Sequence, residues 1–212
     1  NMGVISNGTT LLDAGAIDSG VSTGSLTHIK TITASDTSTM SFVHGSSDVV
    51  FDGTYKEYIF KYISMHPGNE DAAELKFQVS TNGGTGYGVS IQSTSMTVTH
   101  NEADGVSGPD YVNSIDLANS TDFCHITPNN IGNENDENAS GEFHIFDVAS
   151  TTFVKHWYAR CNNTISSDRC NDAYFAGYVN STTAINAIQF QMTNGQTGKT
   201  TGSGIIKMYG VK

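Results

Sequence analysis

SGEFHIFDVASTTFVKHWYARCNN, residues 140–163, is the stretch of sequence that decides the fold. In its first half Phe143 and Ile145 share one face, and Glu142, His144 and Phe146 face the other way. Residues 147–152 form a predicted turn, after which apolar and polar side chains alternate again through Trp157. This pattern predicts a β-hairpin, with its polar side chains on the solvent face.

The same alternation continues along the chain in short segments separated by turns. YKEYIFKYISM, residues 55–65, is the strongest strand, and residues 74–100 predict a hairpin around Asn82-Gly83-Gly84. Further strands are expected at residues 26–35, 173–180, 185–192 and 205–211. Because no 3.6-residue period is sustained, we predict an all-β fold, a single β-sandwich that is jelly-roll-like.

Residues 1–25 differ from the rest of the chain. They hold apolar residues without a strand period: Val4, Ile5, Leu11, Leu12, Ile17 and Val21. The sequence therefore predicts an extended N-terminal arm, residues 1–25, and a β-sandwich domain, residues 26–212. Exposed apolar surface costs roughly 25 cal/mol per Å², so residues 3–25 are expected to pack outside their own sandwich, on a neighbouring copy or another protein.

The composition excludes several functional classes. The formal net charge is −11, with 10 Lys and Arg against 21 Asp and Glu. No basic patch is visible, which argues against a nucleic-acid partner. No apolar run reaches membrane-spanning length, so no membrane insertion is expected.

The cysteines and histidines offer little for a metal or cofactor. No CxxC motif occurs, and NGGTGYG lacks the lysine of a phosphate loop, so no metal and no cofactor are expected. His144 and His156 are interpreted as surface histidines of two strands rather than as ligands. Cys161 and Cys170 flank a turn-like segment and are predicted to lie close enough to oxidise, whereas Cys124 is expected to stay free.

The candidate catalytic carboxylates lie in polar loops: Glu102, Asp104, Glu134, Asp136 and Glu137. A catalytic acid needs an apolar environment that raises its pKa, so these groups are expected to be solvated and non-catalytic. No nucleophile motif is present either. The acidic loop 129–140 offers oxygen ligands but lacks a calcium-loop register, which leaves calcium binding open. We therefore predict no catalytic residues and no enzyme activity.

Three aromatic residues are candidates for a binding surface: Trp157, Tyr158 and Tyr174. Exposed aromatic rings on a β-sandwich can stack on sugar rings. The alternative is packing in the core, which is the commoner role of a single tryptophan on a strand.

Several blocks along the chain carry a resemblance to a known family: GVISNGTTLLDAGAIDSGVSTGSLTHIKTI, YKEYIFKYISMHP, FQVSTNGGTGYG, HNEAD, TTFVKHW, AGYVNSTTAINAIQFQM and GSGIIKMYGVK. Together they resemble small virion surface proteins, tail-fibre-like or capsid-associated, of marine bacteriophages of the cyanophage and pelagiphage type. The NDENAS segment and the segment between Cys161 and Cys170 match no part of that pattern. No catalytic residue comes with the resemblance.

The resemblance implies a non-enzymatic virion structural protein on the particle surface, either a tail fibre for host recognition or a capsid decoration. It implies assembly in the bacterial host cytoplasm, with other virion proteins as partners and a homo-oligomer, preferably a trimer. Reduced cysteines fit that compartment. A host surface glycan is a further candidate partner. The alternative is a glycan-processing β-sandwich enzyme, a lyase or a glycosidase, which would need a close carboxylate pair in a cleft.

Overall fold

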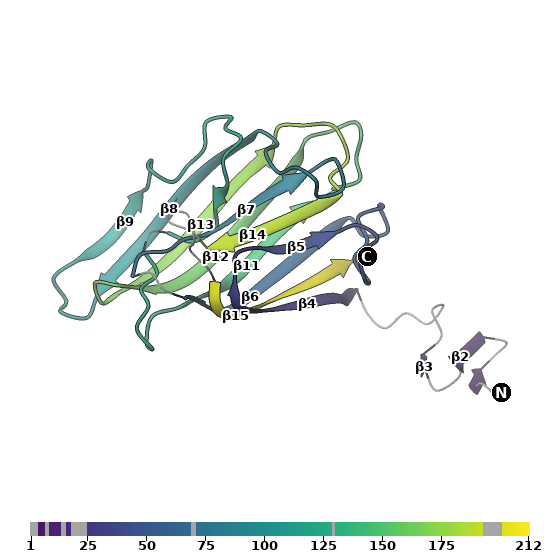
Figure 1. Ribbon diagram of the computed structural model, residues 1–212, viewed down its shortest axis with the longest axis horizontal. Helices are drawn as coiled ribbons and strands as arrows, with labels where there is room; N and C mark the ends of the chain where they lie inside the picture. Colours follow the sequence, from purple (N-terminus) through teal and green to yellow (C-terminus); the bar gives the residue numbers. More distant parts are fainter. Residues whose placement is uncertain are drawn as a thin grey trace.

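The computed structural model describes residues 4–6, 9–13, 16–17, 25–68, 71–128, 130–192 and 201–212. Every regular element in these ranges is a strand apart from turns and bends, and no helix long and apolar enough to cross a membrane occurs among them. The strands form two large antiparallel sheets (Figure 1). The predicted all-β sandwich is therefore confirmed.

The larger sheet has eight strands, and each neighbouring pair is antiparallel. Their order across the sheet is β4 (Leu26–Thr37), β15 (Thr201–Val211), β6 (Glu57–Pro67), β11 (Ala139–Phe146), β12 (Lys155–Ile165), β13 (Arg169–Val179), β8 (Ile91–Asn101) and β9 (Ser107–Tyr111). The opening stretch of the sequence supplies β11 and β12, which pair as the predicted hairpin at the middle of this sheet.

The smaller sheet has four strands in the order β10 (Cys124–His125), β7 (Leu75–Ser80), β14 (Ala187–Met192) and β5 (Met40–Val43). A sandwich of eight strands against four is strongly asymmetric, whereas a jelly roll in its usual form has eight strands in two Greek keys. We therefore describe the fold as an antiparallel β-sandwich, and the jelly-roll detail stays a prediction.

Aromatic side chains from both sheets form the centre of the core. Phe77 from the smaller sheet packs on Phe143 and Trp157 of the larger one, with ring centroids 4.5 and 4.9 Å away. Phe190 lies 5.2 Å from Phe60 in the same way. These side chains come from the inward positions of strands that alternate in burial, as the period-two pattern predicts.

The predicted hairpin around Asn82-Gly83-Gly84 is wrong. β7 belongs to the smaller sheet and pairs with β10 and β14, whereas β8 belongs to the larger sheet and pairs with β9 and β13. Gly83 and Gly84 do have the expected positive φ, at 75° and 76°. The glycine turn therefore carries the chain from one sheet to the other, and turn chemistry alone does not distinguish that role from a hairpin.

The N-terminal segment contains strands that its sequence did not predict. β1 (Val4–Ser6), β2 (Thr9–Asp13) and β3 (Ala16–Ile17) form a separate antiparallel sheet, drawn apart from the two large sheets (Figure 1). Residues 1–3, 7–8, 14–15 and 18–24 lie outside the described residues. The description of residues 1–25 as an extended arm, and its packing on another protein, therefore stay predictions.

Candidate functional site

The outer face of the larger sheet is the candidate site, because no described strand packs over it and large apolar side chains point out from it. The core-facing side of this sheet meets the smaller sheet, while the opposite side exposes Ile63, Met96, Val98, Tyr111, Tyr158 and Tyr174. A cluster of exposed apolar and aromatic residues on one face of a soluble protein commonly marks a binding surface.

One row of side chains crosses this outer face from strand to strand. Met96 on β8 faces Tyr111 on β9 and Tyr174 on β13. Arg160 on β12 faces Tyr174 and, on its other side, Glu142 on β11, which in turn faces Lys61 on β6. Directly opposed side chains lie about 5 Å apart. The row therefore passes from an aromatic end into a charged end within one sheet.

The aromatic end of the row forms a hollow of about 500 Å³. Its walls include Met96, Tyr111, Tyr158 and Tyr174. Ala176 on β13, opposite Tyr158 in the register, contributes a small side chain to its lining. Because Ala176 is small and its neighbours are large, a depression remains between them. The rings of Tyr158 and Tyr174, which are 42% and 40% exposed, are accessible from it.

Tyr174 is held in place by an ion pair beside it. Arg160 forms a two-pronged contact with Asp172, with Nε–Oδ1 and Nη2–Oδ2 distances of 3.1 and 2.9 Å, and its guanidinium lies 5.2 Å from the centre of the Tyr174 ring. The Tyr174 hydroxyl donates to Asp172 at 3.2 Å. The hydrogen bond from Arg160 lowers the pKa of the Asp172 carboxyl, so this carboxylate stays charged at neutral pH.

Tyr158 is held by stacking on a buried histidine. The rings of Tyr158 and His144 are nearly parallel, with a centroid distance of 4.5 Å and an angle of 13°. His144 Nδ1 lies 2.6 Å from Glu57 Oε1, and its Nε2 lies 3.5 Å from Glu142 Oε1. Burial, and then the charges of Glu57 and Glu142, raise the pKa of the Tyr158 phenol. Its hydroxyl is therefore a hydrogen-bond donor at neutral pH.

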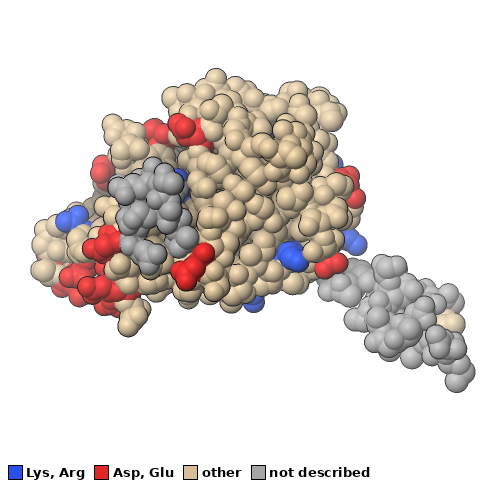
Figure 2. Space-filling model, in the orientation of Figure 1, with Lys and Arg blue, Asp and Glu red and all other residues tan. Residues whose placement is uncertain are grey.

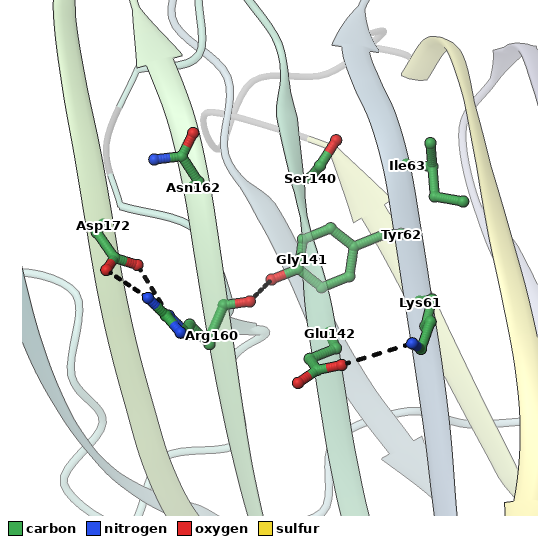
Figure 3. Close-up of a pocket in the computed structure, with 9 residues that line it drawn as sticks. All are labelled: Lys61, Tyr62, Ile63, Ser140, Gly141, Glu142, Arg160, Asn162 and Asp172. Atoms are coloured by element: carbon green, nitrogen blue, oxygen red, sulfur yellow. Dashed lines mark hydrogen bonds and ion pairs between the residues drawn. The ribbon is translucent and has the colours of Figure 1, made fainter.

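The charged end of the row lines a second hollow of about 590 Å³ (Figure 3). Figure 3 shows Lys61 directed toward Glu142, with a Nζ–Oε2 distance of 4.0 Å, and the Arg160–Asp172 pair on the far side. Tyr62 reaches across beneath Gly141 and donates to the Arg160 carbonyl at 3.1 Å. A Cβ atom at residue 141 would lie 2.5 Å from the Tyr62 hydroxyl oxygen, so glycine is required at this crossing.

Of the predicted binding residues, the structure brings Tyr158 and Tyr174 together and excludes Trp157. Trp157 is only 2% exposed and packs in the core. Neighbours on a strand point to opposite faces, so Trp157 and Tyr158 could not share one surface. Gly177 lies opposite Trp157, where a Cβ atom would meet Trp157 Cζ2 at 2.9 Å.

Sequence reasoning missed most of the other residues on this surface: Lys61, Met96, Tyr111, Glu142 and Arg160. Arg160 could have been predicted from the sequence, because it lies two residues after Tyr158 on the same strand and therefore shares its face. Tyr111 could not have been, since its place beside Met96 depends on the pairing of β8 with β9.

The carboxylates that were candidates for catalysis lie in two separate loops, and of these Glu134 and Asp136 line one open surface hollow. Glu102, Asp104, Glu134 and Asp136 are exposed, as predicted. The prediction that Glu137 is solvated is wrong. Its side chain is only 5% exposed and accepts a hydrogen bond from the Glu134 N–H at 2.8 Å. Its carboxylate lies against Gly132, where a Cβ atom would not fit. Glu137 thus organises the acidic loop from inside.

The predicted approach of Cys161 and Cys170 is wrong. Both are on paired strands, but Cys161 faces Ala173 in the register and Cys170 faces Thr164. Cys161 is buried and Cys170 is exposed, so they point to opposite sides of the sheet, and all three cysteines are free thiols. Burial raises the pKa of both the Cys124 and the Cys161 thiol to about 12.

The two strand histidines also lie apart in the register. His144 faces Tyr158, whereas His156 faces Tyr178. His156 is exposed, but His144 is largely buried, which corrects the interpretation of both as surface residues. Among the described residues, no group of three His, Cys, Asp or Glu side chains is placed to hold a metal ion.

Comparison with protein-family models found no match to this chain, and neither the curated proteins nor the solved structures gave one. The resemblance to phage virion proteins therefore stays a prediction from sequence. What the chain does must be inferred from the chemistry of the outer face together with that resemblance.

Proposed function

We propose that this chain is a non-enzymatic surface protein of a phage virion that binds a host surface glycan through the outer face of its larger sheet. The observation that carries the glycan part is the hollow between Tyr111, Tyr158 and Tyr174, beside the ion pair of Arg160 and Asp172. Its place on the virion rests on the sequence resemblance.

The chemistry of the hollow suits sugars. A sugar ring offers an apolar face of C–H groups that stacks on aromatic rings and an edge of hydroxyls that needs donors and acceptors. The three tyrosines supply the ring faces, and Arg160, Asp172 and Glu142 supply hydrogen-bonding groups at their side.

The same side chains are already held in place before any ligand arrives. Tyr111 donates to Asp116, Tyr174 donates to Asp172, and Tyr158 stacks on His144. Side chains that are fixed in the free protein lose little conformational entropy on binding. This arrangement supports a binding surface built in advance.

The protonation states on this face favour binding over catalysis. A glycosidase needs one carboxylic acid with a raised pKa, whereas Arg160 lowers the pKa of Asp172. A tyrosine that abstracts a proton needs a lowered pKa, whereas burial raises that of Tyr158. For Asp172 and Tyr158 the pKa shifts therefore run opposite to those that catalysis would need.

The surface charge agrees with a module that stays soluble on a particle. In the orientation of Figure 2, acidic side chains clearly outnumber basic ones and gather mostly at the left-hand end. The net charge of −11 keeps copies apart in solution. Assembly with other virion proteins, and a homo-oligomer for which we favour a trimer, would then depend on specific contacts such as those expected of residues 3–25.

The glycan part is tested by binding of the purified protein to an array of bacterial surface polysaccharides. Tyr174→Ala and Tyr158→Ala should each lower the affinity about tenfold, because one stacked ring contributes roughly 1 kcal/mol or more. Phe153→Ala is the matched control, since Phe153 is an equally large, 70% exposed aromatic residue outside the hollow. Equal loss in all three variants, or none in any, would contradict the proposal.

The virion part is tested on intact particles. Antibodies against the chain should label the particle surface in electron micrographs, and deletion of residues 3–25 should block incorporation. If the truncated protein were incorporated normally, residues 3–25 would have no role in assembly. If the antibodies left the particles unlabelled, the chain would not be a virion surface protein.

The alternative function, a glycan-processing enzyme, has one observation in its favour. His144 lies between the carboxylates of Glu57 and Glu142, at 2.6 and 3.5 Å, and its ring stacks against that of Tyr158 on the neighbouring strand. Assays for new reducing ends and for unsaturated sugar products, on the polysaccharides that the array identifies, distinguish the two functions. Product formation that His144→Ala abolishes would establish the enzyme.

A further inference from the structure

Three hollows on the outer face adjoin one another. The aromatic hollow shares Arg160 and Glu142 with the charged hollow. On its other side it shares Tyr158 and Ala176 with a third hollow of about 440 Å³, which is also lined by His156 and Tyr178. Because neighbouring hollows have wall residues in common, they follow one another along this face, and we call the row of three the groove.

The groove follows a single strand. The outward residues of β12 are His156, Tyr158, Arg160 and Asn162, one at every second position. His156 lines one end of the groove, Tyr158 and Arg160 line its middle, and Asn162 lines the other end. His156 and Asn162 are six residue steps apart along the extended strand, which makes the groove about 20 Å long.

We infer that this groove binds an internal stretch of a neutral, linear glycan chain, several sugars long, rather than one terminal sugar. The inference rests on the proposed glycan function and specifies its ligand. A length of about 20 Å exceeds what a single sugar covers, and the groove is open along its length rather than closed around one ring.

The charges in the groove favour a neutral ligand. Arg160 is paired with Asp172, and Lys61 lies 4.0 Å from Glu142, so each cation that lines the groove is opposed by a carboxylate. Such ion pairs offer hydrogen-bond donors and acceptors to sugar hydroxyl groups, while each pair carries no net charge. A polyanion would meet Glu142 and Asp172 directly, in a protein whose net charge is already −11.

The two ends of the groove are polar and its centre is aromatic. His156, Gln92 and Tyr178 lie at one end, and Asn162 and Ser140 at the other. A short saccharide can occupy the aromatic centre alone, whereas only a longer chain reaches both ends. Affinity should therefore increase with chain length.

The test is calorimetric titration of the full chain with cello-, laminari- and malto-oligosaccharides, from the monosaccharide to the hexasaccharide. In the series that binds, affinity should rise about tenfold or more between the disaccharide and the hexasaccharide. It should change little when salt is added, since no net charge is neutralised. Equal affinity for the monosaccharide and the hexasaccharide overturns the chain-length inference while leaving the proposed function intact.

Variants at the ends make the test specific. His156→Ala and Asn162→Ala should each weaken hexasaccharide binding several-fold and leave disaccharide binding unchanged, whereas Tyr174→Ala should weaken both. Asn162 also donates to the Asn171 carbonyl at 3.0 Å, so Ile63→Ser, on the rim of the same end, provides a second variant whose fold is checked by thermal unfolding. Unchanged hexasaccharide binding in all end variants overturns the inference.

Two further outcomes identify other ligands. Tighter binding of alginate, an acidic polysaccharide, than of any neutral oligosaccharide overturns the neutral assignment only. Failure of every saccharide to bind, the polysaccharides of the array included, overturns the proposed function as well. If sedimentation then shows self-association that Tyr174→Ala removes, the face is an interface between copies of this chain.

Discussion

The two faces of β12 have opposite characters although their residues alternate along one strand. Inward lie Trp157, Ala159 and Cys161, all buried, and outward lie Tyr158 and Arg160, both exposed. The inner residues meet a second sheet, whereas the outer ones meet no described strand. Two consecutive residues of one strand can therefore belong to the core and to the candidate site. Four predictions test how strongly the two faces differ in reactivity and in their contribution to stability.

The largest contrast is expected between the cysteines of the two faces. Cys161 is buried with a thiol pKa of about 12, while Cys170 is exposed. Because the thiolate is the reactive form, burial and the raised pKa of Cys161 should together slow its alkylation by orders of magnitude. Iodoacetamide followed by mass spectrometry should label Cys170 in the native protein and spare Cys124 and Cys161, and denatured protein is the control that labels all three. Native labelling of Cys161 would show that the core opens.

Truncation of the aromatic residues comes next. Trp157→Ala removes a ring that packs on Phe77 and Phe143 and should lower the free energy of unfolding by about 3–5 kcal/mol. Tyr158→Ala, one residue on, should cost less than about 1 kcal/mol, because its ring is half exposed. Urea unfolding of both variants measures the difference. Similar losses would mean that the outer face is part of the stabilising core.

Lys155 breaks the expectation that polar residues of the hairpin face solvent. It is 1% exposed, and its ammonium donates to the carbonyls of Ser181 and Thr183 at 3.1 and 2.7 Å. Lys155→Ala leaves both carbonyls without this partner and should cost about 1–3 kcal/mol. Lys56→Ala is the control, since its exposed pair with Asp147 contributes less than about 1 kcal/mol. Equal effects in the two variants would contradict the structural role of Lys155.

The smallest effect is expected from the ion pair on the outer face. Arg160 lowers the pKa of Asp172 in the folded state. The pair therefore stabilises the fold above the unfolded pKa of about 3.9, and this contribution is lost as the pH falls through the lower folded value. At neutral pH, Asp172→Asn should be less stable than wild type by less than about 1 kcal/mol. This difference in stability should shrink as the pH falls below the unfolded pKa of about 3.9. If the stability difference between wild type and Asp172→Asn grew as the pH fell, the ion pair would not stabilise the fold in the way stated.

Much of the fold follows from the period-two pattern. The alternation in residues 55–65 and 140–163 correctly predicted β6, β11 and β12, since burial of every second side chain is a local property of a strand. The pairing of β7 and β8 could not be predicted, because Gly83 and Gly84 fit both a hairpin turn and a crossing between sheets. The burial of Lys155 was likewise hidden, since its carbonyl partners lie 26 and 28 residues away.

The sequence by itself determined that the chain is all-β and that Trp157 and Tyr158 point to opposite faces of one strand, because alternation and turn residues act over a few positions. Only the tertiary structure decided that Trp157 is core, that Tyr111 and Met96 complete the aromatic hollow, and that the outward residues of β12 line one groove. The reason is physical. Which face of a strand is buried depends on the sheet that packs against it, and which residues are neighbours depends on strand pairing between distant segments.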